Sequence, residues 1–96
     1  MSTSQGVIFL KKKNVNGESK WFEDGDEEND GKYVGEIENG KPNGQGTYTS
    51  PVGGTFIGEW KDGREWNGTG YNKNGEIVVR FVNGKQIEQS SLQILY

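Results

Sequence analysis

The chain has 96 residues and a net charge of −3, and only 29% of its residues are hydrophobic. With a mean hydropathy of −0.91, it can bury only the thin core of one small domain, so a large enclosed active-site cavity is not expected. The chain contains 16 Gly and no Ala. Because each interior glycine costs a helix about 1 kcal/mol, this composition argues against a helical bundle and predicts an all-β fold.

The absence of Cys and His also narrows the chemistry. Without Cys the chain has no thiolate nucleophile, no disulfide framework and no structural zinc of the usual kind. Without His it has neither a Ser-His-Asp triad nor an imidazole base. Carboxylates, Lys, Tyr and Ser remain for catalysis, and we expect no cofactor. No segment approaches the roughly 18 apolar residues of a membrane span or resembles a signal peptide, so we expect a cytoplasmic protein.

Residues 1–30 are expected to form a degenerate hairpin followed by an acidic loop. Lys11, Lys12 and Lys13 directly follow a short apolar run. These lysines are candidates for weak contact with anionic lipid headgroups. Lysines on an edge strand also protect a sheet against edge-to-edge aggregation, and this second reading is favoured.

Residues 23–38 contain eight acids and one base, so the negative charge of the chain is concentrated in one patch. Such a patch is most often a solvated loop. A calcium site is the sharper alternative, because Asp26, Glu28 and Asp30 fit positions 1, 3 and 5 of a calcium-binding loop. The match is only partial, since Ile37 stands where the loop would need a bidentate Glu.

Dipeptides that favour turns, Asn-Gly and Asp-Gly, recur from residue 16 to residue 84. Asn-Gly and Asp-Gly suit turns that require positive φ, and the segments between them are rich in aromatic and β-branched residues. The pattern predicts an elongated antiparallel meander of β-hairpins. Asn-Gly begins at residues 16, 39, 43, 67, 74 and 83, and Asp-Gly begins at residues 24, 30 and 62.

The hairpins are copies of one another. Residues 31–41 align with residues 54–64 at an offset of 23, and residues 43–48 align with residues 67–71 after an insertion at Glu65-Trp66. A third copy begins at Gly75, in which Val79 replaces the glycine of the repeat. We therefore expect one domain over 1–96 that contains repeat 1 (31–53), repeat 2 (54–74), a partial repeat 3 (75–85) and a C-terminal cap or docking tail (86–96).

Each repeat places a glycine between two large side chains on one face of a strand, as Gly58 lies between Phe56 and Trp60. Such a glycine leaves a flat floor on which a neighbouring aromatic ring can lie. Gly44 and Gly46 are expected to offer the same floor on the returning strand. A series of such hairpins would share one continuous narrow core.

The repeated motif Tyr/Phe-x-Gly-Glu, with a Gly-Lys or Gly-Arg turn and a following Gly-x-Gly, resembles the MORN repeat (membrane occupation and recognition nexus). The resemblance covers residues 31–75 well and residues 76–85 loosely. It implies an open array of antiparallel hairpins that is non-catalytic and that binds proteins, dimerises or approaches phospholipid. The residues that carry the repeat are Tyr33, Gly35, Glu36, Gly40, Gly44, Gly46, Tyr48, Phe56, Gly58, Glu59, Trp60, Gly63, Gly68, Gly70 and Tyr71.

Protein–protein interaction or scaffolding, with an unidentified partner or a second copy, is the leading hypothesis for function. Association with phosphoinositide or a membrane surface is an alternative, and carbohydrate binding through surface aromatics is a third. Trp66, in the insertion, is the main candidate for a partner contact because the repeat does not require it. Trp60 and the other repeat aromatics either line a groove or form the core of the array. Nucleic acid is not expected as a partner, because the three lysines form the only basic patch.

Overall fold

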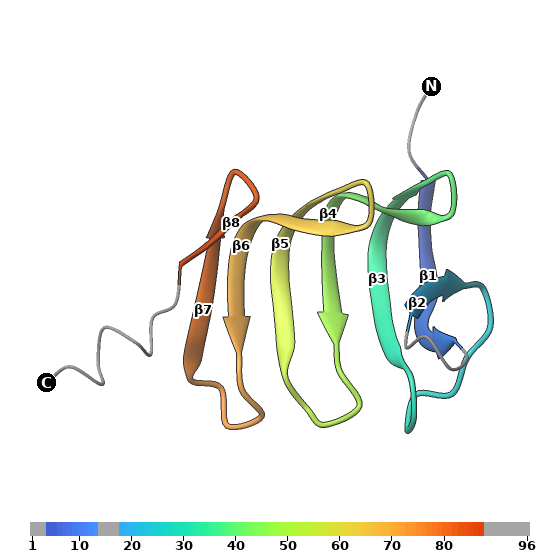
Figure 1. The fold of residues 1–96 in the computed structure, drawn as a ribbon, viewed down its shortest axis with the longest axis horizontal. Coiled ribbons are helices and arrows are strands. Elements are labelled where there is room, and N and C mark those ends of the chain that lie inside the picture. Colours follow the sequence, from blue (N-terminus) through green and yellow to red (C-terminus); the bar gives the residue numbers. More distant parts are fainter. Residues whose placement is uncertain (1–3, 14–17, 88–96) are drawn as a thin grey trace, which may run out of the picture.

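The computed structural model describes residues 4–13 and 18–87. Within these residues there is no helix, and eight antiparallel strands form one open sheet in the order β2-β1-β3-β4-β5-β6-β7-β8 (Figure 1). The predicted all-β meander of hairpins is therefore confirmed. The strands are β1 (Ser4–Lys13), β2 (Glu18–Phe22), β3 (Gly31–Glu38), β4 (Lys41–Thr49), β5 (Thr55–Lys61), β6 (Arg64–Tyr71), β7 (Ile77–Val82) and β8 (Lys85–Ile87).

Three hairpin turns are built from the predicted dipeptides. Asn39, Asp62 and Asn83 have φ values of 55°, 51° and 51°, and the glycine that follows each of them also has a positive φ. Positive φ at both central residues defines a type I′ turn, whose twist matches that of the strands it connects. The three turns lie along the upper end of the array in Figure 1.

Two other Asn-Gly dipeptides lie inside strands, so the prediction of a turn at each was wrong. They begin at Asn43 in β4 and at Asn67 in β6. The Oδ1 atom of Asn43 accepts a hydrogen bond from the backbone N–H of Asp62 at 3.0 Å, and that of Asn67 accepts one from Asn83 at 2.9 Å. Each of these asparagines therefore ties its own hairpin to the type I′ turn of the next one.

The glycine floor exists on the returning strands. Gly46 faces a glycine on each neighbouring strand, and the ring of Tyr33 lies across it. A Cβ atom added to Gly46 would come within 2.1–2.3 Å of atoms of that ring. Phe56 lies across Gly68 in the same way, with ring atoms 2.8 Å from the position of an added Cβ. Glycine at these positions lets a large ring lie flat against the backbone of the next strand.

Two details of the predicted floor were wrong. Gly44 has a φ of 109°, and a Cβ there would meet the Glu36 carboxylate rather than an aromatic ring. The alignment places Gly70 over Gly46, but the residue opposite the Gly58 of β5 is Gly68. Both returning strands bulge after the turn, but β4 has two extra residues there and β6 has only one. The segment between the turn and this glycine is therefore one residue shorter in β6 than in β4, whereas the alignment makes it one residue longer.

The buried core lies on one face of the sheet, which we call the inner face. Its buried hydrophobic residues are Ile8, Tyr33, Phe56 and Trp60. The ring centroids of Tyr33 and Trp60 are 5.2 Å apart, and those of Phe56 and Trp60 are 5.4 Å apart, both in edge-to-face geometry. Aromatic pairs prefer this arrangement. These three rings therefore form the core of the array, and the outer sides of Phe56 and Trp60 also line clefts on this face.

Tyr33 is fully buried, yet its polar atom is satisfied. The hydroxyl donates a hydrogen bond to the backbone oxygen of Glu36 at 2.8 Å and also lies 3.3 Å from the backbone oxygen of Gln45. Burial, reinforced by the charge of Glu36, raises the pKa of Tyr33 to about 12. Folding therefore favours the neutral phenol.

The raised pKa predicts a loss of stability in alkaline solution. The ordinary pKa of tyrosine is about 10, so the contribution of Tyr33 is complete below pH 10 and is lost as the pH rises through about 12. Tyr33→Phe removes this titration and one hydrogen bond, which costs about 1 kcal/mol at neutral pH. The melting temperature, measured by circular dichroism, should fall more steeply between pH 10 and pH 12 for the wild-type chain than for Tyr33→Phe. Parallel curves would contradict this, because Tyr48 titrates in both proteins and cancels in the difference.

The N-terminal hairpin folds back over the inner face. β1 pairs with both β2 and β3, so the expectation that its lysines protect an edge strand was wrong, and β2 is the edge strand. The ring of Trp21 in β2 lies 6.1 Å from the rings of Tyr33 and Tyr48 and 6.5 Å from that of Trp60. Those rings belong to β3, β4 and β5, and in Figure 1 β2 lies in front of the sheet at its N-terminal end, from where the Trp21 ring reaches them.

At the other end, β8 pairs with β7. Gln86 and Ile87 therefore continue the third hairpin instead of beginning a separate tail. Residues 88–96, to which the predicted cap or docking role applies, lie outside the described residues. That role stays a prediction.

Candidate binding groove

A cleft of about 290 Å³ opens on the inner face beside the buried rings. A second cleft of about 230 Å³ adjoins it and shares Tyr48 and Glu65 with it. We call the two clefts together the inner groove. The first cleft is lined by Leu10, Trp21, Tyr48, Trp60, Gly63 and Glu65, which come from β1, β2, β4, β5, the β5–β6 turn and β6.

Aromatic rings form the walls of the first cleft. Trp60 is buried, whereas Trp21 and Tyr48 are only half-buried. The centroid of Tyr48 lies 6.1 Å from each of the two tryptophan rings. The indole N–H of Trp60 donates to the backbone oxygen of Gly46 at 3.3 Å, but that of Trp21 makes no hydrogen bond within the described part of the chain. The cleft therefore offers both ring surface and a free donor.

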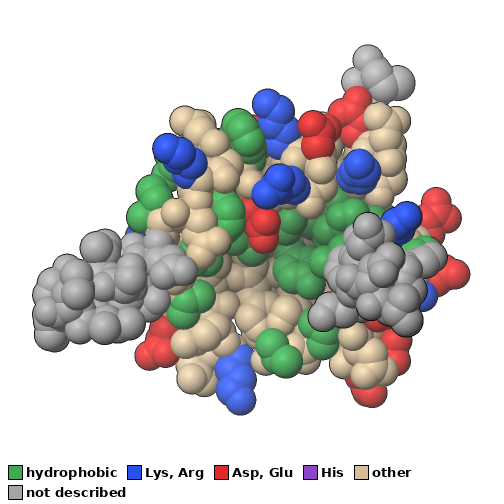
Figure 2. Space-filling model, viewed as in Figure 1, with side chains coloured by type: hydrophobic (Ala, Val, Ile, Leu, Met, Phe, Trp, Pro, Cys, Tyr) green, Lys and Arg blue, Asp and Glu red, His purple; other side chains and the backbone are tan. Residues whose placement is uncertain are grey.

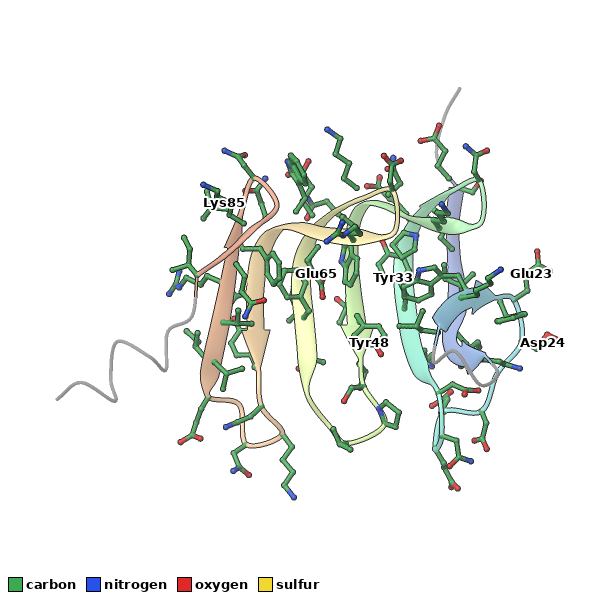
Figure 3. The ribbon with its side chains drawn as sticks, in the orientation of Figure 1. Glu23, Asp24, Tyr33, Tyr48, Glu65 and Lys85 are labelled. Carbon is green, nitrogen blue, oxygen red and sulfur yellow. The ribbon has the colours of Figure 1, made fainter. Side chains whose placement is uncertain are left out.

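Glu65 faces the inner groove because the Asp62-Gly63 turn pairs it with Trp60, just before the bulge in β6. Trp60 pairs with Glu65, while the preceding residue of β5 pairs with Asn67, so Trp66 is the extra, unpaired residue. Cross-strand partners share a face, and Glu65 therefore points to the same side as Trp60. Figure 3 places Glu65 and Tyr48 near the middle of this face, and Figure 2 shows an acidic side chain there among hydrophobic ones.

The Glu65 carboxylate has no partner of opposite charge. Among the described residues it makes no hydrogen bond and no ion pair, and neither cleft is lined by Lys or Arg. Burial first, and then the negative charge of Glu65, raises the pKa of Tyr48. The inner groove is thus an apolar, aromatic surface that carries one half-buried negative charge.

Comparison with known families identifies the repeat. A family model of the MORN repeat matches residues 33–55 and 56–66. The chain is a MORN-repeat protein. The two matches begin at Tyr33 and Phe56, the equivalent inner-face aromatics of β3 and β5. MORN repeats are modules of membrane or protein association and are generally non-catalytic.

Comparison of this MORN-repeat protein with curated proteins and with solved structures found no match. The residues that the structure describes form no helix of the length and apolarity that crossing a membrane requires. The family match therefore supplies the only comparison from which a role can be argued.

Trp66, the predicted partner contact, does not stand on a loop. It lies within β6 and is half-buried, and its contact with a partner stays a prediction. Its ring covers the turn glycine Gly84, where an added Cβ would lie 2.5 Å from a ring atom. The ammonium of Lys61 sits 4.5 Å from the ring centroid. Trp66 therefore packs the β7–β8 turn of the MORN array against β6.

The other repeat residues of this MORN protein lie in structural positions. Glu36 accepts a hydrogen bond from the backbone N–H of Gln45, and Glu59 accepts one from the side chain of Asn67 at 2.9 Å. Both carboxylates therefore tie neighbouring strands together. Tyr71 is half-buried at the end of β6 and lines the second cleft.

The lysine run is only partly described. The ammonium of Lys11 lies 5.3 Å from the centroid of the Phe22 ring on β2. The side chains of Lys12 and Lys13 lie outside the description. The predicted contact of these lysines with anionic lipid stays a prediction.

The acidic loop of the MORN protein uses its carboxylates internally. Asp26 accepts hydrogen bonds from the backbone N–H of Glu28 at 2.9 Å and from the side chain of Asn29 at 2.7 Å. These two bonds, the backbone one first, lower the pKa of Asp26. Asp30 accepts a hydrogen bond from the backbone N–H of Asp26 at 2.9 Å. Since the described residues contain no group of three acidic side chains able to hold a metal ion, the partial calcium motif is not supported.

Sequence reasoning missed Trp21 and Glu65. Trp21 pairs with Leu10 across the N-terminal hairpin, and their spacing around the Asn-Gly dipeptide of the sequence was the available signal. The signal for Glu65 was the Asp-Gly dipeptide at residues 62–63, because a two-residue turn there pairs Glu65 with Trp60.

Proposed function

We propose that this MORN-repeat protein is a non-catalytic, intracellular module that binds a partner protein through its inner groove. The observation that carries the proposal is the half-exposed pair Trp21 and Tyr48 beside Glu65. Tryptophan and tyrosine bury a large area at little cost in conformational entropy, and interfaces are enriched in them. Trp21 is supplied by the N-terminal hairpin and not by a repeat, which gives the groove of this chain a wall of its own.

The same observations favour lipid association less than protein binding. The chain carries a net charge of −3, and the groove itself contains an unpaired carboxylate. An anionic headgroup would be repelled from such a surface. A protein segment can instead offer apolar side chains to the rings, and those contacts do not depend on a negative surface.

Paired variants test the proposal. Trp21→Ala removes a groove wall, whereas Ile57→Ala removes apolar surface from the opposite face, where Ile57 is 50% exposed. Cross-linked partners would be captured from cell extract with each purified protein, and folding would be checked by circular dichroism. We expect Ile57→Ala to keep the partner that the wild-type chain captures and Trp21→Ala to lose it.

Co-flotation with phosphoinositide liposomes, at low and physiological salt, examines the alternative. We expect no flotation at physiological salt. Salt-sensitive flotation that disappears when Lys11, Lys12 and Lys13 are changed to Gln would replace protein binding by lipid binding. Equal capture by the two alanine variants would show that the groove is not the binding surface.

A further inference from the structure

We infer that the first cleft of the inner groove receives an arginine side chain of the partner, with the guanidinium paired to Glu65. This inference rests on the proposed function and adds the chemistry of the ligand. It starts from a mismatch of charge inside the groove. Glu65 is half-buried and makes no hydrogen bond or ion pair in the described part of the chain. Lys61 and Arg64 share a separate cleft with it, but no described Lys or Arg lines either cleft of the inner groove.

A neutral ligand would bury the Glu65 carboxylate without giving it a positive partner. A peptide that covered the cleft with apolar side chains alone would take the carboxylate out of water without giving it a partner, which is strongly unfavourable. The bound partner must therefore bring a positive charge to Glu65, or leave that side of the cleft open. Charge complementarity favours the first arrangement.

The walls of the cleft select arginine among the possible cations. The rings of Trp21 and Tyr48 line the same cleft as Glu65. A guanidinium is flat and weakly hydrated, so it can stack on an aromatic face while two of its N–H groups bind one carboxylate. A lysine ammonium is a strongly hydrated point charge and would leave the ring surfaces less well covered.

The second cleft predicts which kind of residue lies near that arginine in the partner. It shares Tyr48 and Glu65 with the first cleft, and its other lining includes the apolar side chains of Phe56, Val79 and Phe81. In an extended segment, residues i and i+2 point to the same side. A peptide with an arginine and a large apolar residue two positions away would thus fill both clefts at once.

Selection from a display library of random peptides tests the inference. The library would be panned on the wild-type chain and, in parallel, on Glu65→Gln and on the matched control Glu28→Gln, which makes the same change of charge on the exposed acidic loop. We expect peptides enriched on the wild-type chain to share an arginine beside an apolar residue. Their affinity should fall about ten- to a hundredfold on Glu65→Gln, and not on Glu28→Gln.

A neutral isostere separates the charge from the shape. Replacing the arginine of a selected peptide by citrulline should cost as much as Glu65→Gln, and the two changes together should cost no more than one. Peptides that bind the groove without arginine, or that bind Glu65→Gln as well as the wild-type chain, would overturn the inference and leave protein binding by the groove intact. Failure to select any peptide that Trp21→Ala loses would overturn both proposals.

Discussion

Gly46→Ala is expected to lower the free energy of unfolding by about 3 kcal/mol, near the upper end of the usual cost of overpacking a core. The new Cβ would lie 2.1–2.3 Å from atoms of the Tyr33 ring, so one of the two must move. The Tyr33 ring has little room to shift, because it is fully buried and its hydroxyl is hydrogen-bonded to a backbone oxygen of its own hairpin. Its ring also packs against Trp21 and Trp60.

Gly75→Ala is the matched control for the backbone. Gly75 has a φ of 86°, and nothing lies within 4 Å of the position of an added Cβ, so its replacement costs only the strain of positive φ, about 1 kcal/mol. Urea denaturation followed by circular dichroism measures both variants. Tyr33→Leu should recover part of the loss in Gly46→Ala, because a smaller side chain makes room for the methyl group. Equal losses at the two glycines, or strict additivity with Tyr33→Leu, would show that the ring can simply shift.

The sequence predicts the hairpin array because its strongest signals are local. A type I′ turn depends on residues that can adopt positive φ, and Asn39, Asp62 and Asn83 with their glycines supply them without help from the rest of the chain. Period-2 alternation similarly places Tyr33 and Phe56 on one face. The fold class therefore follows from features that extend over fewer than about ten residues.

The same local chemistry misleads at Asn43 and Asn67. Each precedes a glycine, as Asn39 does, but each lies in a strand and binds the turn of the next hairpin. The side chain of asparagine bonds to backbone groups in both settings, so the dipeptide alone does not tell them apart. Only the pairing of successive hairpins decides which role an asparagine takes.

The inner groove was harder to predict from the sequence because its walls come from distant parts of the chain. Trp21 meets Tyr48 and Trp60 only because β2 folds over the inner face. The Asp62-Gly63 turn pairs Glu65 with the inward-facing Trp60, while the bulge leaves Trp66 packed on the next turn. A shift of one residue in a strand moves side chains to the opposite face, so a small error in register changes which residues form the site.

Trp60→Ala is expected to have the largest effect of all, a loss of about 4 kcal/mol in the free energy of unfolding. Trp60 is 4% exposed and is the ring that joins the N-terminal hairpin to the repeats, with Trp21, Tyr48 and Phe56 all within 6.5 Å of it, centroid to centroid. Its removal leaves a cavity under the inner groove that these rings cannot close without breaking their edge-to-face contacts.

Trp66→Ala is the matched control, since it makes the same substitution at a half-buried tryptophan whose ring covers the turn glycine Gly84. We expect it to cost about 1–2 kcal/mol, because less surface leaves the interior and no core cavity forms. Thermal melts should place the two variants well apart, at roughly 4–8 °C for each kcal/mol in a domain of this size. If Trp66→Ala proved the more damaging, the array would depend on the packing of its last turn more than on the aromatic core.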